Sequence, residues 1–314
     1  NQEKICECIL EAEKLRAKIL VFPELCVTGY TCGDLFTQDV FLRNARQALL
    51  HIAEFTKEKD MLVFVGLPLC VEGKLYNVAA ALSKGKLLGI VPKCHLPNYS
   101  EFYEQRHFTA GMEEPVMTEW QGGKVPMGSR LLFACREVPE LLVAAEICED
   151  VWVPCPPSIG HVLAGALLIA NCSASDETVG KDSYRRDLIT GQSARLMCGY
   201  VYANAGEGES TQDLVFGGHN IIAENGTMLA ASKRFVPESI YADMDLDRLV
   251  SERRRTNTHP GQQQEGYLTV EFSLETKHME RRQEKELLRR IPSRPVVPGD
   301  ASERSRRCEE IFAI

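Results

Sequence analysis

The stretch LLVAAEICEDVWVP, residues 141–154, places Cys148 at the end of an apolar run that is typical of a buried strand. A turn at the exit of a strand can expose a cysteine sulfur while the strand holds the main chain, an arrangement that suits a nucleophile. Free cysteines are also among the most buried residues in proteins. Taken alone, the stretch therefore favours a core cysteine and leaves the nucleophile as an alternative.

Two other apolar runs end in the same manner. In KILVFPEL (18–25) a proline is followed by Glu24, and in LLGIVPKCHLP (87–97) a proline is followed by Lys93. A charged side chain at a strand end is usually solvated, and proline commonly ends a strand. In an open α/β sheet, however, reactive groups collect at the carboxyl ends of strands. The coincidence of the three runs makes Glu24, Lys93 and Cys148 a candidate catalytic trio.

The strings VFPELCVTGY, PKCHLPNYSEFYE and EICEDVWVP, which surround this trio, resemble the nitrilase (carbon-nitrogen hydrolase) superfamily. The resemblance is most specific to the glutaminase domain of glutamine-dependent NAD synthetases and extends from the first residues to about Asp247. It implies an α/β fold, a nitrilase-like four-layer αββα sandwich, that pairs with a second copy to form a homo-oligomer.

The chemistry of the trio can be argued from the residues themselves. An amide is a poor electrophile, so its hydrolysis needs a thiolate, a proton for the departing ammonia and stabilisation of the oxyanion. Lys93 beside Cys148 would lower the pKa of the thiol. Glu24 would carry the proton from thiol to ammonia and then activate water. The oxyanion would lie between the Lys93 ammonium and the backbone N–H of Glu149.

The resemblance also implies roles for four further residues. Glu101, eight residues beyond Lys93, matches a carboxylate that orients the lysine in related amidases, although it can equally be a surface acid. Tyr99 matches a tyrosine that contacts glutamine, and Ser175 and Lys181 match the serine and basic residue that hold the amino acid's α-groups. A loop tyrosine is otherwise a packing residue, and a lysine after glycine a surface charge.

Composition excludes several other classes of protein. The 314 residues are 44% hydrophobic, enough for a sizeable core, and the formal charge of -8 argues against nucleic-acid binding. The 12 cysteines and seven histidines are scattered without metal-ligand spacing, which favours a reduced, cytoplasmic protein with no metal. No apolar run is long enough to span a bilayer, so we expect no membrane partner.

The order of elements is typical of an α/β sandwich. Apolar periodicity predicts helices near residues 5–15, 44–55, 159–164 and 182–197, a hairpin over 75–92 with Gly85 in its turn, and strands near 19–22, 61–66, 131, 142, 167–171, 200–206, 214–226 and 227–232. Because the chain opens inside a helix, we expect a preceding strand to be missing.

The last sixty residues differ in composition. We expect residues 1–250 to form the glutaminase domain and residues 251–314, which include RRQEKELLRR and IPSRPVVPGD, to form a charged hairpin or linker on the surface. Ser302 is a candidate cap for a final helix that the chain end interrupts. By resemblance, this segment leads towards a synthetase domain that uses ATP and Mg and is not present in this chain.

These observations predict a glutamine amidohydrolase without a cofactor of its own. The ammonia would amidate adenylylated deamido-NAD in the adjoining domain. One alternative is a stand-alone nitrilase-type amidase that acts on another small amide. A second is a non-catalytic interaction module that keeps the sandwich, against which the intact Glu24, Lys93 and Cys148 argue.

Overall fold

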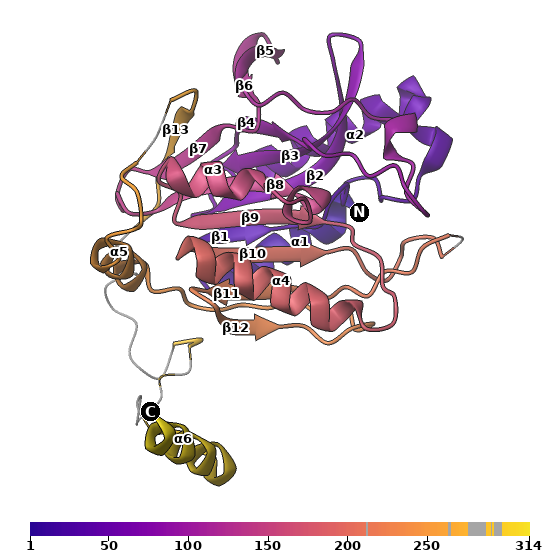
Figure 1. Ribbon diagram of the computed structural model, residues 1–314. Coiled ribbons are helices and arrows are strands. Elements are labelled where there is room, and N and C mark those ends of the chain that lie inside the picture. Colours follow the sequence, from indigo (N-terminus) through magenta and orange to yellow (C-terminus); the bar gives the residue numbers. More distant parts are fainter. Residues whose placement is uncertain (212, 263–264, 276–286, 290, 292–296) are drawn as a thin grey trace.

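The protein folds around two β-sheets that pack face to face. The computed structural model describes residues 1–211, 213–262, 265–275, 287–289, 291 and 297–314 (Figure 1). The first sheet has six strands in the order β1 (Ile19–Val21), β2 (Leu62–Val71), β3 (Lys74–Ser83), β4 (Lys86–Pro92), β6 (Gly123–Met127), β5 (Val116–Trp120). The second has seven, in the order β12 (Thr227–Ala231), β11 (Ile221–Glu224), β10 (Gly199–Asn204), β9 (Leu168–Ser173), β8 (Leu142–Ile147), β7 (Leu131–Cys135), β13 (Leu268–Phe272).

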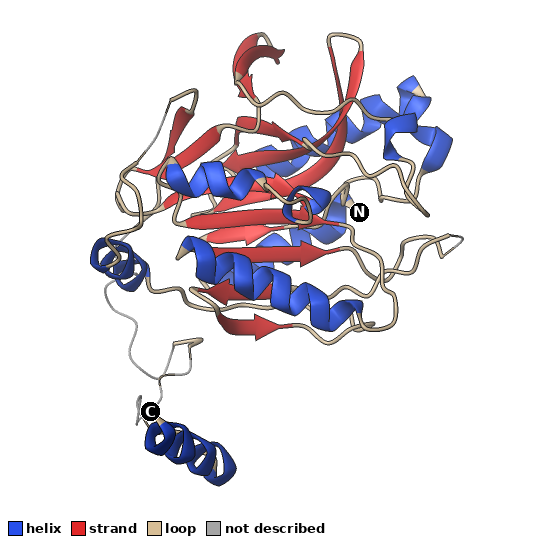
Figure 2. Ribbon diagram, viewed as in Figure 1, coloured by secondary structure: helices blue, strands red, loops and turns tan. Residues whose placement is uncertain are grey.

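Helices cover the outer face of each sheet, as Figure 2 shows. The pair α1 (Gln2–Lys14) and α2 (Asp39–Phe55) covers the first sheet, and the pair α3 (Pro157–Leu163) and α4 (Lys181–Leu196) covers the second. Each layer interface has its own cluster of buried apolar side chains. The expected αββα sandwich is therefore confirmed.

The core between the sheets explains why the strands read as continuous apolar runs. Strand β9 is buried along its whole length, and β2 is buried over its first eight residues. A strand that is covered on both faces has no solvent side on which polar residues could alternate. Phe64 of β2 and Phe133 of β7 meet edge to face across this core, with ring centroids 5.5 Å apart.

Most elements lie where the sequence predicts them. The hairpin of β3 and β4 is present, with Lys84 and Gly85 both at positive φ (47° and 81°), as a tight two-residue turn requires. Helix α2 begins at Asp39, earlier than expected. The strand expected from residue 214 begins only at Ile221, and the β5–β6 hairpin was not expected.

The expected domain boundary at residue 250 falls inside helix α5 (Leu246–Arg255). Arg253 of this helix donates hydrogen bonds to the carbonyl oxygens of Met197, at 3.0 Å, and Ala166, at 2.8 Å. Beyond α5, β13 joins the second sheet in parallel with β7. Helix α5 and strand β13 therefore continue the sandwich beyond the expected boundary.

A final helix, α6 (Ala301–Ala313), lies apart from the sandwich in Figure 1, and none of its residues is buried. Asp300 caps it by accepting a hydrogen bond from the N–H of Glu303 at 2.9 Å, so the cap is Asp300 and not Ser302. Much of RRQEKELLRR and IPSRPVVPGD lies outside the described residues. Within the described part, no helix is both long and apolar enough to cross a membrane.

Candidate active site

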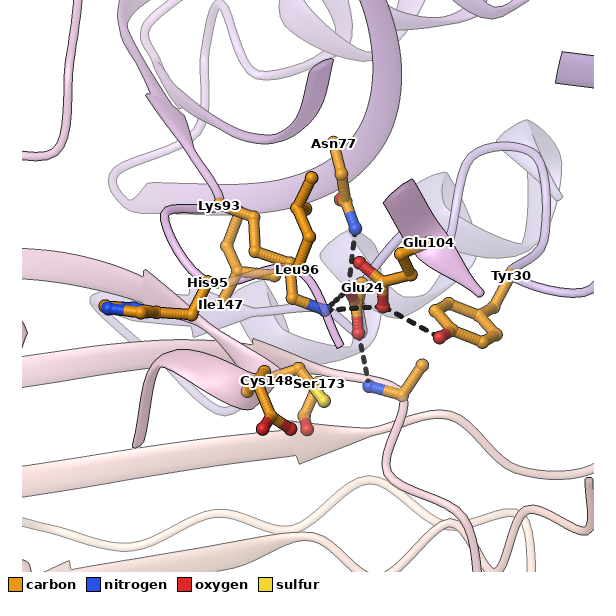
Figure 3. Close-up of polar contacts among 12 residues, drawn as sticks. Glu24, Tyr30, Asn77, Lys93, His95, Leu96, Glu104, Ile147, Cys148 and Ser173 are labelled. Atoms are coloured by element: carbon orange, nitrogen blue, oxygen red, sulfur yellow. Dashed lines mark hydrogen bonds and ion pairs between the residues drawn. The ribbon is translucent and has the colours of Figure 1, made fainter. Parts of the chain in front are cut away.

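Three strand ends bring Glu24, Lys93 and Cys148 together between the two sheets. Glu24 follows β1, Lys93 follows β4 and Cys148 follows β8, and their exposed fractions are 0%, 1% and 6%. The Lys93 Nζ lies 2.7 Å from Glu24 Oε1. Figure 3 shows the Cys148 sulfur on the side of these two charged groups, and both charges act on the thiol.

Three donors hold the Glu24 carboxylate. Besides Lys93, the Asn77 side chain donates to Oε1 at 2.6 Å and the Ala174 N–H donates to Oε2 at 2.9 Å. Ala174 follows β9 of the second sheet, so the carboxylate is held from both sheets at once (Figure 3). Its orientation is therefore set before any substrate enters, as a group that transfers protons requires.

Gly66 in β2 allows the segment that carries Glu24 to lie close against the strand. A Cβ on Gly66 would lie 2.3 Å from the Leu25 nitrogen and 2.7 Å from the Pro23 oxygen. Real side chains do not tolerate such distances, so only glycine lets the segment around Glu24 cross the strand so closely.

Cys148 sits in a strained backbone turn. Its φ is +44°, in the left-handed region that residues other than glycine rarely adopt, and it opens the 3-10 turn η3 (Cys148–Val151). The Cys148 N–H donates to Asn171 Oδ1 at 3.1 Å. The turn expected from the sequence at the exit of this strand is therefore present in the backbone, and we call this turn at Cys148 the elbow.

The protonation state of the thiol differs from the sequence-based expectation. Burial raises the pKa of Cys148, Glu24 raises it further, and Lys93 lowers it. Lys93 thus acts in the expected direction, but burial and Glu24 outweigh it. The resting nucleophile is a neutral thiol, so its proton must leave during the attack.

The carboxylate that contacts Lys93 on its other side is Glu104, not Glu101. Glu104 Oε1 lies 2.6 Å from the Lys93 Nζ and accepts a hydrogen bond from the Tyr30 hydroxyl at 2.7 Å. Glu101 lies three residues earlier and lines, together with Glu104, a neighbouring pocket of about 260 Å³. Its predicted contact with the lysine is therefore corrected to Glu104, which the short 3-10 turn η2 (Glu104–Arg106) turns towards the site.

Burial and charge act against each other in this cluster. Burial alone would lower the pKa of Lys93, but Glu104 and Glu24 more than offset it, and the pKa lies well above its usual range. Burial raises the pKa of Glu104 to about 7, although Lys93 opposes that shift. Lys93 therefore remains a cation around neutral pH.

Two of the expected substrate-binding residues lie near the elbow. Tyr99 is 55% exposed and donates to Glu149 Oε1 at 2.9 Å. Lys181 forms an ion pair with Asp176, and its ammonium lies 5.4 Å from the centroid of the Trp152 ring, within reach of a cation–π contact. The structure thus places both side chains beside the residues that follow Cys148.

Ser175 is buried and held by its surroundings. Its N–H donates to Asn204 Oδ1 at 2.7 Å, and its hydroxyl lies 3.4 Å from an N–H donor of Arg185. Arg185 is itself fully buried, donates to the Asp176 carbonyl at 2.9 Å and pairs with Glu177. This arginine, which the sequence analysis did not single out, secures the loop that carries Ser175.

The expected oxyanion donor, the N–H of Glu149, lies in the first turn of η3. The first N–H groups of such a turn have no acceptor within it, which suits the expected role. Among the residues that the structure describes, no group of three or more metal-binding side chains is gathered at one place.

Sequence reasoning also missed Tyr30, Asn77 and Asn171. Asn77 and Asn171 are nonetheless visible as single amides within apolar runs, LYNVAAAL and LLIAN. A polar residue at a buried strand position must find a partner, and this is the signal that could have marked both. Tyr30 offers no such signal, because its role depends on Glu104.

Comparison with known proteins identifies the family of the chain. The carbon-nitrogen hydrolase profile matches residues 1–254. A glutamine-dependent NAD(+) synthetase of Mycobacterium tuberculosis is 40% identical over 309 residues, which cover 95% of this chain and 44% of the synthetase. That of Aquifex aeolicus is 36% identical over 247 residues, covering 78% and 40%. The chain spans less than half the length of these relatives.

Solved structures give the same result. A glutamine-dependent NAD(+) synthetase from Cytophaga hutchinsonii superposes with a TM-score of 0.67 at 33% identity, covering 74% of this chain and 37% of that one. A mutant nitrilase-superfamily amidase from Nesterenkonia AN1 superposes with a TM-score of 0.59 at 20% identity, covering 81% and 89%, a likeness of fold alone. With the profile match and the buried Glu24, Lys93 and Cys148, the chain belongs to the carbon-nitrogen hydrolase family.

Proposed function

We propose that this chain hydrolyses the side-chain amide of glutamine to glutamate and ammonia through a thioester on Cys148. The observation that supports the proposal most is the buried contact of Glu24 with Lys93 beside the Cys148 elbow. The relatives named glutamine-dependent NAD(+) synthetases support the choice of substrate.

The reaction begins with a neutral thiol. As the Cys148 sulfur attacks the amide carbon, Glu24 takes the thiol proton. The negative charge that develops on the amide oxygen faces the Lys93 ammonium and the Glu149 N–H. The carbon–nitrogen bond then breaks, Glu24 gives its proton to the leaving nitrogen, and ammonia departs from the thioester.

Hydrolysis of the thioester uses the same groups. Glu24 removes a proton from water, the hydroxide attacks the thioester carbonyl, and the oxyanion again faces Lys93. When the carbon–sulfur bond breaks, the proton on Glu24 returns to the Cys148 sulfur. The enzyme is restored and glutamate leaves, so no redox group or metal enters the balance.

The α-groups of glutamine would be recognised beside the elbow. The Lys181 ammonium suits the α-carboxylate, and the Ser175 hydroxyl and Tyr99 supply further hydrogen bonds. Lys181 is paired with Asp176, which also offers an anion for the α-ammonium. This set of charges favours an amino acid over a plain aliphatic amide.

The wider assignment follows the full-length relatives. We infer that the ammonia amidates an adenylylated deamido-NAD intermediate in an adjoining synthetase domain that uses ATP and Mg, and that the hydrolase needs no cofactor. We also infer a homo-oligomer in the cytoplasm, without nucleic-acid or membrane partners. The formal charge of -8 supports the exclusion of nucleic acid.

The test is to measure glutamate and ammonia release by the purified chain, with Cys148→Ala and, as a matched control, Cys155→Ala, whose cysteine is exposed. Equimolar products from the wild type and the control, and none from Cys148→Ala, would support the proposal. Faster hydrolysis of asparagine or propionamide than of glutamine would favour the stand-alone amidase. A folded chain that hydrolyses none of these amides would favour a non-catalytic module.

A further inference from the structure

A chain of buried polar groups lies behind the elbow, on the side of the second sheet that α3 and α4 cover. Asn171 Oδ1 accepts the Cys148 N–H at 3.1 Å, and Asn171 Nδ2 donates to the Tyr200 hydroxyl at 3.0 Å. The Tyr200 hydroxyl donates in turn to Glu146. We call Asn171, Tyr200 and Glu146 the elbow network.

The network is sealed from solvent. Asn171 and Tyr200 are 0% exposed and Glu146 is 1% exposed. The second oxygen of Glu146 accepts the Ser158 N–H, at 2.8 Å, near the start of α3. A buried carboxylate is costly unless donors surround it, and Glu146 has two. The hydrogen bonds of this network run to Cys148, among its own members and to Ser158, so the contact between Glu24 and Lys93 does not explain them.

The direction of each hydrogen bond follows from what each group can donate. An ionised carboxylate only accepts, so above the Glu146 pKa of about 7 the Tyr200 proton points at Glu146 and the Tyr200 oxygen is free to accept from Asn171. That bond selects one orientation of the Asn171 amide, with its oxygen towards Cys148. The reversed amide would set an N–H against the Cys148 N–H.

The position of the sulfur depends on this amide. The backbone of Cys148 is strained at a φ of +44°, and such strain persists only where the surroundings hold it. The Cys148 side chain packs with the apolar cluster between the sheets, whereas its N–H is held from the helix side of the second sheet. A rotated Asn171 would release the turn and move the sulfur relative to Glu24 and Lys93.

We propose that Asn171, Tyr200 and Glu146 are positioning residues for the nucleophile: Asn171 holds the Cys148 N–H, and Tyr200 and Glu146 keep the Asn171 amide in the orientation that does so. Only the kinetic part of the test rests on the proposed glutaminase function. The reactivity of the thiol itself reports on the network independently.

The experiment compares Tyr200→Phe with the wild type. Tyr200→Phe keeps the ring but removes the hydroxyl that orients Asn171. We expect kcat for glutamine to fall about ten-fold or more, because small displacements of reacting groups are costly, while KM changes less than about two-fold. Alkylation of Cys148 by iodoacetamide, followed by mass spectrometry of its peptide, should slow as well.

Two further variants separate positioning from stability. Ser193→Ala removes another buried hydrogen bond on α4, from its hydroxyl to the Cys198 carbonyl at 2.7 Å, and should lower the melting temperature without changing kcat or labelling. Tyr200→Phe leaves the Glu146 carboxylate with one donor fewer and should therefore lower the melting temperature. The double variant Tyr200→Phe/Glu146→Gln removes this charge as well. We expect it to recover the melting temperature while its kcat and its rate of Cys148 labelling stay low.

Each outcome decides between the roles. Wild-type kcat and labelling in Tyr200→Phe, or recovery of kcat together with melting temperature in the double variant, would overturn the proposal. If Tyr200→Phe does not fold, the double variant provides the same comparison. A wild type that hydrolyses no glutamine, combined with slower Cys148 labelling in Tyr200→Phe but not in Ser193→Ala, would reject the proposed function and retain the elbow network.

Discussion

The Lys93 ammonium lies 2.6 Å from Glu104 and 2.7 Å from Glu24, so two buried carboxylates share one cation. The two carboxylates have different partners. Glu104 also accepts from Tyr30, whereas Glu24 accepts from Asn77 and Ala174 and acts on the Cys148 thiol. Glu104 can therefore hold the lysine in place while Glu24 exchanges protons with the substrate.

The first prediction concerns this division of roles. Glu104→Gln removes one of the two anions that hold Lys93, so the ammonium should turn towards Glu24 and away from the oxyanion position. We expect kcat to fall about ten- to hundred-fold, as for other misplaced catalytic groups. Steady-state hydrolysis of glutamine measures the change.

Glu101→Gln is the matched control, because Glu101 lines the same pocket without contacting Lys93. Its kcat should remain within about two-fold of the wild type. A larger loss in Glu101→Gln than in Glu104→Gln would return the lysine-orienting role to Glu101.

The second prediction separates Glu24 from Lys93. Glu24→Gln removes the proton acceptor, and Lys93→Ala removes the cation, at a cost of roughly 3 kcal/mol or more in the barrier by analogy with the loss of an oxyanion donor. Both variants should lose most hydrolysis. Their effects on the thiol should be opposite, because Glu24 raises the pKa of Cys148 and Lys93 lowers it.

Iodoacetamide labelling of Cys148 across a pH series reads this difference. At a given pH the labelling rate, relative to the wild type, should rise in Glu24→Gln and fall in Lys93→Ala, because the thiolate fraction changes in opposite directions. An unchanged rate in Lys93→Ala across the pH series would mean that the lysine does not act on the thiol, and the site would have to be redrawn.

The strand ends explain how much of the site the sequence could predict. Glu24, Lys93 and Cys148 each follow an apolar run, and burial of those runs in two facing sheets is enough to bring their ends together. The sandwich itself followed from a resemblance carried by the strings around these residues. Local pattern and overall fold agree at these positions, so the sequence could predict that the three side chains lie together, while their catalytic roles stay a prediction.

The predictions that failed depend on contacts between residues far apart in the sequence. Whether Glu101 or Glu104 reaches Lys93 depends on how the loop after β4 turns at η2, which periodicity does not encode. Likewise, the thiol pKa depends on burial, and the sequence shows only that Lys93 is present. The β5–β6 hairpin and β13 were missed because their exposed positions weaken the apolar pattern.

The third prediction is that no metal is required. Glu24, Lys93 and Cys148 supply the base, the cation and the nucleophile from protein groups. Glutamine hydrolysis should therefore be unchanged after prolonged treatment with EDTA and gel filtration. Activity that disappears with EDTA and returns with zinc would contradict this mechanism.

The fourth prediction links the elbow network to folding stability. Burial raises the pKa of Glu146 from 4.5 to about 7, although Tyr200 and Ser158 donate to it. Below pH 4.5 the group is protonated in both folded and unfolded chains, and its contribution to stability is complete. As the pH rises, the unfolded chain ionises first, so this contribution is lost until the pH passes about 7.

The difference between the pKa of Glu146 in the unfolded chain, 4.5, and in the folded chain, about 7, corresponds to a loss of at most about 3 kcal/mol in the free energy of unfolding. Glu146 and Glu104 should each make the free energy of unfolding in urea fall from pH 5 to pH 8, whereas His161 and His219, whose pKa values burial lowers to about 4, should make it rise. The test is therefore the change in stability from pH 5 to pH 8 in Glu146→Gln relative to the wild type. This change should shift towards greater stability at pH 8, because the glutamine side chain does not ionise.

Glu137→Gln serves as the control, since the pKa of Glu137 is lowered, chiefly by the hydrogen bond from the Leu274 N–H. That variant should lose stability at both pH values and keep the wild-type difference between them. A wild-type difference between pH 5 and pH 8 in Glu146→Gln as well would show that burial does not raise the pKa of Glu146.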